Sequence, residues 1–171
     1  MTYILRALKG GDRRSIGNSD AVARRISSDP KLFAQAFNAI LSRDPLLRMR
    51  AADAVEKATR QHPELLRPFK SKLLRQVAAI EQQEVRWQVA LMLPRLQLTP
   101  TEVDLAVSIL LDYLADKSSI ERTCAMQGLA DLALQHHRLS TRVIALIESL
   151  TANGSAAMRS RGRKLLARLK H

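Results

Sequence analysis

Residues 44–55 read DPLLRMRAADAV, and this stretch decides the fold class. Asp44 is a favoured N-cap residue, and Pro45 suits the first position of a helix, where no backbone N–H is needed. Apolar and small residues then follow at offsets 0, +4, +7 and +8 from Leu47, which is the spacing of one face of an α-helix. The stretch therefore predicts a capped amphipathic helix.

The same pattern recurs along the chain. Segments that start with an apolar residue and mostly carry apolar or small residues at these offsets begin at Leu47, Val85, Ile120 and Met158. Their starts are 38, 35 and 38 residues apart, which is the length of a helical hairpin. A second apolar stripe precedes each segment. We expect helix pairs at 30–42 with 45–61, 63–80 with 83–97, 100–116 with 118–136, and 139–152 with 155–170.

Capping residues and a proline refine these boundaries. Thr99 with Glu102, and Ser118 with Glu121, have the spacing of capping boxes. Pro94 lies inside the helix predicted at 83–97 and cannot donate a backbone hydrogen bond, so it should bend that helix or end it early. The predicted core residues are Leu47, Ala51, Val55, Val85, Val89, Leu93, Ile120, Cys124, Met158 and Leu165.

Two short motifs resemble a known repeat family. The stretches 44–48 (DPLLR) and 84–86 (EVR) resemble the turn and second-helix start of HEAT repeats, where a D-P-x-V-R-x-x-A pattern recurs. The third copy departs from the pattern because Glu121 replaces the arginine, and the fourth has Gly162 where alanine is usual. Residues 9–17, which include Gly10 and Gly11, resemble the start of small bacterial HEAT-repeat proteins of unassigned function.

The family resemblance implies an all-α fold, a right-handed αα-superhelix (a HEAT or armadillo-like solenoid) of about four helical hairpins. Because one hairpin cannot bury its apolar face alone, we expect a single domain over residues 1–171. Its predicted parts are an N-terminal capping segment at 1–28 and repeats at about 29–61, 62–98, 99–137 and 138–171. The commonest role in the family is partner binding.

Composition limits the classes of function. The chain has 171 residues, 46% hydrophobic and only 4% aromatic, which favours helices packed through aliphatic side chains. Its net charge is +12, with six basic and no acidic residues over 149–171, but six basic and nine acidic residues over 81–148. This basicity fits either an acidic partner such as nucleic acid or a solvated surface. No signal peptide or membrane span is recognisable, so we expect a cytoplasmic protein without membrane contact.

Motifs for catalysis or cofactor binding are missing from the sequence. No metal-ligand spacing, nucleophile motif or phosphate loop is found, and Cys124 falls on the apolar stripe as a core residue. The HEAT-like alkylpurine DNA glycosylases use aromatic clusters with a carboxylate, and this chain has no such cluster. We therefore expect no enzymatic activity, no metal, no cofactor and no small-molecule substrate.

The second helix of each pair supplies the candidate binding residues. In HEAT hairpins these helices line the concave face, and offsets +2, +3 and +6 should point away from the core. The resulting partner-binding candidates are Met49, Arg50, Trp87, Gln88, Leu91, Arg122 and Met126. An aromatic centre with arginines at its rim is typical of an interface, although Trp87 would equally serve as packing between hairpins.

The C-terminal helix offers a second candidate site. Its anion-binding candidates are Arg159, Arg161, Arg163 and Lys164. The same cations would also serve as a polar end cap that favours the negative end of the helix dipole. Our leading hypothesis is a non-enzymatic scaffold that binds a protein, and the alternative is binding of a nucleic-acid backbone through the basic terminal repeats.

Overall fold

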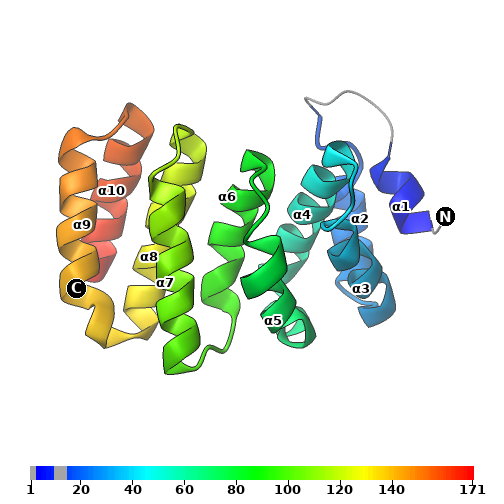
Figure 1. The fold of residues 1–171 in the computed structure, drawn as a ribbon, viewed down its shortest axis with the longest axis horizontal. Coiled ribbons are helices and arrows are strands. Elements are labelled where there is room, and N and C mark those ends of the chain that lie inside the picture. Colours follow the sequence, from blue (N-terminus) through cyan, green and yellow to red (C-terminus); the bar gives the residue numbers. More distant parts are fainter. Residues whose placement is uncertain (1–2, 10–14) are drawn as a thin grey trace. The chain divides into compact units, whose positions relative to one another are not determined.

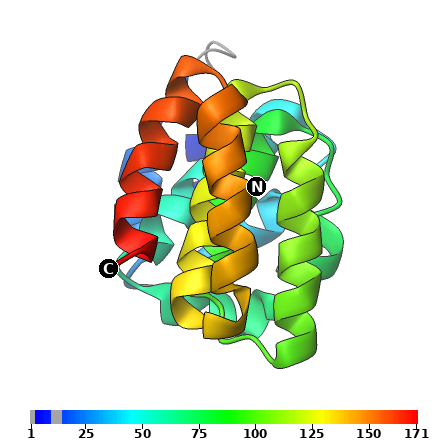
Figure 2. The ribbon, with the colours of Figure 1, turned by 90° about the vertical axis from the view of Figure 1, so that its left-hand side faces the viewer.

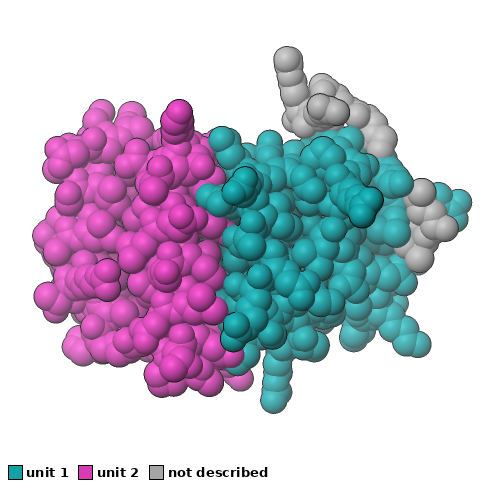
Figure 3. Space-filling view, viewed as in Figure 1, with its two compact units in different colours: residues 1–96 teal, residues 97–171 magenta. Residues whose placement is uncertain are grey.

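A computed structural model describes residues 3–9 and 15–171 of the protein (Figure 1). These residues form helices and connecting turns, with no strand among them, so the all-α prediction is confirmed. The contacts divide the chain into two compact units, Met1–Leu96 and Gln97–His171 (Figure 3). Gly10 and Gly11 of the N-terminal resemblance lie outside the described residues.

Unit 1 consists of helix pairs that follow one another along the chain. Its α-helices are α1 (Tyr3–Leu8), α2 (Ser19–Ile26), α3 (Pro30–Ala39), α4 (Pro45–Thr59), α5 (Lys70–Lys72) and α6 (Gln83–Met92). α1 contacts α2, α3 contacts α4, and the second helices form a layer in which α2 contacts α4 and α4 contacts α6. The segment predicted as an N-terminal cap thus contains a helix pair of its own, whose apolar positions Ile4, Leu8, Val22 and Ile26 are buried.

The first helix of the next pair changes its pitch along its length. A 3-10 helix, η1 (Pro63–Phe69), leads through α5 into a π-helical turn, η2 (Leu73–Val77). Pro68 lacks a backbone N–H, and its ring would clash with the carbonyl four residues earlier, so a regular α-helix cannot continue through it. Pro94 acts in the same way, because α6 ends at Met92 and continues only as the 3-10 turn η3 (Leu93–Arg95).

Unit 2 has the elements α7 (Pro100–Leu114), α8 (Ser119–Gln135), the 3-10 turn η4 (His137–Leu139), α9 (Ser140–Asn153) and α10 (Ala156–Leu169). α8 contacts both α7 and α10, and α9 lies beside α10 (Figure 2). The predicted capping box at Thr99 and Glu102 is present, and the Ser118 side chain accepts a hydrogen bond from the Glu121 N–H. These caps place the start of both helices close to the predicted residues.

The buried stripe of α8 begins one residue later than predicted. Ile120 is 56% exposed and Cys124 is only half-buried, whereas Glu121 and Ala125 are fully buried. The cap explains the shift, because the first buried residue of the second helix stands three positions after the N-cap in each of these pairs. The N-caps and first buried residues are Asp44 and Leu47, Gln82 and Val85, Ser118 and Glu121, and Ser155 and Met158. The other eight predicted core residues are buried.

With the register corrected, the third copy of the repeat also has an arginine directly after its first buried residue. Arg122 now follows the first buried residue, as Arg48, Arg86 and Arg159 do in their helices. Three of these arginines hold the turn before their own helix: Arg48 donates to the Ser42 carbonyl (3.1 Å), Arg86 to that of Ile80 (3.3 Å) and Arg159 to that of Gly154 (2.8 Å). The prediction that Glu121 occupies the arginine position is therefore wrong.

Candidate binding surface

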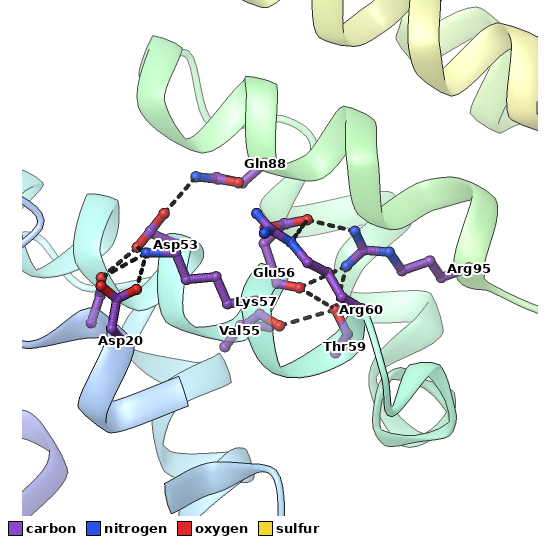
Figure 4. Close-up of polar contacts among 10 residues, drawn as sticks. Asp20, Asp53, Val55, Glu56, Lys57, Thr59, Arg60, Gln88 and Arg95 are labelled. Carbon is purple, nitrogen blue, oxygen red and sulfur yellow. Dashed lines mark hydrogen bonds and ion pairs between the residues drawn. The ribbon is translucent and has the colours of Figure 1, made fainter. Parts of the chain in front are cut away.

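α4 carries a row of charged side chains that neighbouring helices partly cover. Asp53 and Glu56 are buried, Lys57 is about one-fifth exposed, and Arg60 is more than half exposed at its side chain. Residues three, four or seven apart share one face of a helix, so the row runs down a single side of α4. Figure 4 shows this row between side chains from α2 and from the α6–η3 segment.

α2 is joined to this row by hydrogen bonds at its first turn. The Ser19 hydroxyl donates to the Asp53 carboxylate, and Lys57 forms ion pairs with Asp20 and, at 2.7 Å, with Asp53 (Figure 4). Lys57 thereby lies between two carboxylates from different helices. Burial by itself would lower the pKa of Lys57, but the hydrogen bonds from Lys57 to Asp20 and Asp53 outweigh it and raise that pKa above 10.5.

The α6–η3 segment is joined to Asp53 and Glu56 of the same row. Gln88 donates to the Asp53 carboxylate at 3.1 Å, and Arg95 donates to the Glu56 carboxylate and, at 2.7 Å, to the Glu56 carbonyl. Arg60 holds the same carboxylate at 2.6 Å. Burial would raise the pKa of Glu56, but the hydrogen bonds from Arg60 and Arg95 outweigh it and hold that pKa below its ordinary value of 4.5.

Arg50, a predicted partner-binding residue, is instead part of the core. It is 1% exposed and donates to the Leu8 carbonyl at 3.1 Å and to the Ser15 carbonyl at 3.0 Å. Gly17, at a φ of 56°, lies against its guanidinium, since a Cβ there would sit 2.9 Å from the Arg50 Cζ. Arg50 therefore ties the N-terminal helix pair to α4, and the expectation that it points away from the core is wrong.

The remaining candidates divide by burial. Gln88 and Met126 are buried, so the expected outward orientation is wrong for them too, because the neighbouring helices cover more of each second helix than its period predicts. Met49, Trp87, Leu91 and Arg122 are half-buried and keep part of their surface accessible. The Nε of Arg122 is buried without a hydrogen-bond partner among the described residues.

Two surface hollows flank α4 in unit 1. One, of about 260 Å³, lies at the starts of α4 and α6 and is lined by Leu46, Arg48, Met49 and Glu84, among others. The other, of about 300 Å³, lies between α2 and α4 and includes Arg24, Lys57, Arg60 and Gln61 in its lining. Met49 at the first hollow and Lys57 at the second lie eight residues apart on one face of α4, with the buried Asp53 between them.

The basic residues of α10 are mostly engaged in contacts within unit 2. Arg161 donates to Gln127 at 2.8 Å, Arg168 pairs with Asp131 at 3.0 Å, and Lys170 pairs with Glu148 at 2.6 Å. Arg163 and Lys164 are exposed, and no partner of either is found in the described part of the chain. Within the predicted anion-binding set, Arg159 and Arg161 thus donate to neutral acceptors and keep their positive charge, whereas Arg163 and Lys164 have no such contact among the described residues.

The polar links between second helices were missed by the sequence analysis. They join residues 34 to 39 positions apart in both units, as in Asp53 with Gln88, Glu56 with Arg95, and Gln127 with Arg161. A search for complementary polar residues at the repeat spacing would have found them. The predicted helix period alone placed Asp53 on the accessible face, although it is only 8% exposed.

Three further features concern the part of the chain that the structure describes. No group of three or more His, Cys, Asp or Glu side chains in that part of the chain has the arrangement of a metal site. Phe33, Phe37 and Phe69 form a cluster beside an apolar hollow of about 410 Å³. None of the described helices combines the length and apolar character that crossing a membrane requires.

Comparison with known proteins gives a structural likeness only. No family model matches this chain, and no curated protein matches it. The crystal structure of an engineered protein is similar to it, with a TM-score of 0.61 and 14% sequence identity, over 98% of this chain and 78% of that chain. At this level of identity the likeness concerns the fold.

Proposed function

We propose that this chain is a non-enzymatic scaffold, a HEAT-type αα-solenoid that binds a protein segment along its layer of second helices. Two features support the solenoid. Within each unit, successive second helices contact each other, and the hydrogen bonds between their side chains recur at separations of 34 to 39 residues. Such contacts between nearest neighbours are the basis of repeat-protein stability.

The hollow at the starts of α4 and α6 is the observation that carries the binding proposal. Pro45, Leu46 and Met49 give it an apolar part, and Arg48, Gln82 and Glu84 give it a polar part. Trp87 is half-buried on α6, one turn after Glu84 and so on the same side of that helix. An apolar centre with a polar rim and a nearby large aromatic residue is the usual composition of a protein interface.

A photo-crosslinking amino acid in place of Met49 tests this proposal directly. We expect a defined protein from native lysate to be cross-linked at that position, in the presence and absence of nuclease. Gln76, exposed on η2, provides the matched control position. Cross-linking that is equal at both positions, or that disappears with nuclease, would contradict the proposal.

Trp87→Ala then separates binding from packing. If Trp87 anchors the partner, its truncation should weaken binding by about 2 kcal/mol, in addition to the moderate loss of stability expected from removing a half-buried ring. Because Trp87 is the single tryptophan, its fluorescence emission should also shift when the purified partner is added. A large loss of stability without a binding defect would identify Trp87 as a packing residue.

Binding of a nucleic-acid backbone through α10 is the second candidate function. The observation in its favour is the pair of exposed cations Arg163 and Lys164, which no described side chain neutralises. Since the neighbouring cations are hydrogen-bonded within unit 2, this surface offers fewer phosphate contacts than its sequence predicts. Phosphate binding would show a steep salt dependence, which the partner cross-linked at Met49 should lack.

A further inference from the structure

The hollow between α2 and α4 has a surplus of positive charge. Its lining contains one carboxylate, Asp20, and the cations Arg24, Lys57 and Arg60, of which Lys57 and Arg60 also pair with Asp53 and Glu56 outside the lining. Lys57 is held between two carboxylates, and Glu56 is shared by two arginines. Arg24 is exposed and has no hydrogen-bond or ion-pair partner among the described residues.

The positive charges of Arg24 and Arg60 act on groups inside the hollow. The pKa of Asp20, which lines the hollow, is lowered mainly by its hydrogen bond from Lys57 and further by the nearby charges of Arg24 and Arg60. Ala23 and Ala58, both small, line the hollow between these polar groups and leave it about 300 Å³. The arrangement combines an unoccupied guanidinium with room for one anionic side chain, and Arg is the residue best suited to bind a carboxylate through two hydrogen bonds.

We propose that this hollow binds a carboxylate side chain from an acidic segment of a partner protein. The proposal rests on the proposed scaffold function and names the chemistry of its partner. Unit 1 contains 18 of the 28 Lys and Arg residues but only 9 of the 16 Asp and Glu residues, so an acidic segment is attracted to it.

The lining favours a peptide over a nucleic acid. Asp20, with a side chain 59% exposed, can accept a hydrogen bond from a peptide N–H, a donor that a phosphate backbone lacks. Gln61, also in the lining, can both donate and accept. Among the described residues, no aromatic side chain lines the hollow, so they offer no stacking surface for a base there.

The distance between the two hollows sets the spacing within the bound segment. Met49 and Lys57 are eight residues apart on one face, which corresponds to about 12 Å along a helix. An extended chain covers that distance in about four residues. The segment should therefore carry an acidic residue about four positions from the apolar residue that enters the hollow at Met49.

Arg24→Gln and Arg25→Gln form the matched pair that tests this inference. The two residues are adjacent on α2 and exposed, but Arg25 lies over the Tyr3 ring, 5.1 Å from its centroid, and does not line the hollow. Both variants lose one positive charge and should fold as the unchanged protein does. Hexaglutamate is the probe, and its binding is followed through backbone amide shifts of the full-length protein.

Hexaglutamate should shift the amide signals of Ser27 and Gln61 in a saturable way. Loss of one charge-assisted hydrogen bond predicts that Arg24→Gln raises the Kd about tenfold, and Arg25→Gln should raise it less than about twofold. Equal weakening in the two variants, or shifts spread over the whole surface, would overturn the inference. So would tighter binding of oligothymidylate or of inorganic phosphate than of hexaglutamate at the same amides.

Failure of this inference is distinguishable from failure of the scaffold function. If Arg24→Gln and Arg25→Gln behave alike while the cross-link at Met49 persists, only the carboxylate site is wrong. If the cross-link at Met49 is absent, the scaffold function is wrong, whatever hexaglutamate does.

Discussion

Glu56 is a buried carboxylate whose desolvation is offset by two arginines. Its side chain is 1% exposed, and an isolated carboxylate in such a place would be strongly destabilised. Arg60, one turn away, donates three hydrogen bonds to the Glu56 carboxylate. Arg95, from the η3 turn, donates one to the same carboxylate and one to the Glu56 carbonyl. Glu56 consequently couples α4 to the end of α6.

Acid should weaken the fold through Glu56. Its pKa in the folded protein lies below the ordinary value of 4.5, so the unfolded chain takes up the proton first as the pH falls. The stabilising contribution is therefore complete above that ordinary value and is lost as the pH falls towards the folded pKa. Urea unfolding at a series of pH values should show this loss. Glu56→Gln should reduce stability at neutral pH by roughly 3 kcal/mol and flatten the acid dependence.

Glu64 provides the control for this measurement. It is exposed and contacts only the His62 side chain at 3.2 Å among the described residues. Glu64→Gln should leave both the neutral stability and its acid dependence nearly unchanged. An acid dependence that survives in Glu56→Gln would assign the effect to other carboxylates.

At the scale of the helix, the register of α8 is decided by its cap and its apolar stripe together. Starting at Ile120, the stripe meets Cys124 and then Gly128, which bury little surface. Starting at Glu121, it meets Ala125, Leu129 and Leu132, all of which are buried. The greater apolar area of the second stripe outweighs the burial of one carboxylate.

Two substitutions in α8 test that register. Ile120→Asp should change the free energy of unfolding by less than about 0.5 kcal/mol, because the side chain is already exposed. Leu129→Asp should cost more than about 3 kcal/mol, because it places an unpaired charge in the core. Chemical denaturation of both variants is the measurement, and comparable losses would contradict the register.

α10 contains a glycine whose role is packing against α9. A Cβ at Gly162 would overlap the Thr151 hydroxyl and lie 2.9 Å from the Thr151 Cβ. Gly162→Ala should therefore destabilise the protein, although alanine favours a helix by about 1 kcal/mol over glycine. Thr151→Ala should recover most of that loss in the double variant. If Gly162→Ala proves stabilising by itself, the two helices are not in close contact at this point.

For the whole molecule, the uneven charge distribution determines how binding should respond to salt. Unit 1 contains most of the surplus cations, whereas Arg159, Arg161 and Arg168 of α10 already donate hydrogen bonds within unit 2. A protein bound at a few side chains loses far less affinity with salt than a nucleic acid held at many phosphates.

Replacement of Arg159, Arg161, Arg163 and Lys164 by Gln tests this distribution. The variant should keep the partner cross-linked at Met49, and the partner's Kd should rise no more than about tenfold between 50 and 200 mM salt. A binder that neutralises six phosphates would lose about a thousandfold over the same range. Loss of the cross-linked partner in this variant would show that the partner binds at α10 instead.

The sequence by itself determined the helical class, the pairing of helices and most of the core. Caps such as Asp44 and Thr99 and apolar positions such as Val55 and Val89 act locally, through backbone hydrogen bonds and the helix period, so they can be read along the chain. The same local rules predicted that Pro94 would bend its helix or end it early. The partly accessible candidates Met49 and Trp87 were also found in this way.

Only the tertiary structure decided what the polar residues do. Arg50, Asp53 and Gln88 stand at positions that the helix period assigns to the surface, yet they are buried by helices that pack from both sides. Apart from Lys57, which pairs with Asp53 from one turn away, their partners are 34 or more residues away, as with Asp53 and Gln88 or Arg50 and Ser15. A buried polar group is stable only when such a partner is in place, and the partner's position depends on how the helices pack, which no local pattern contains.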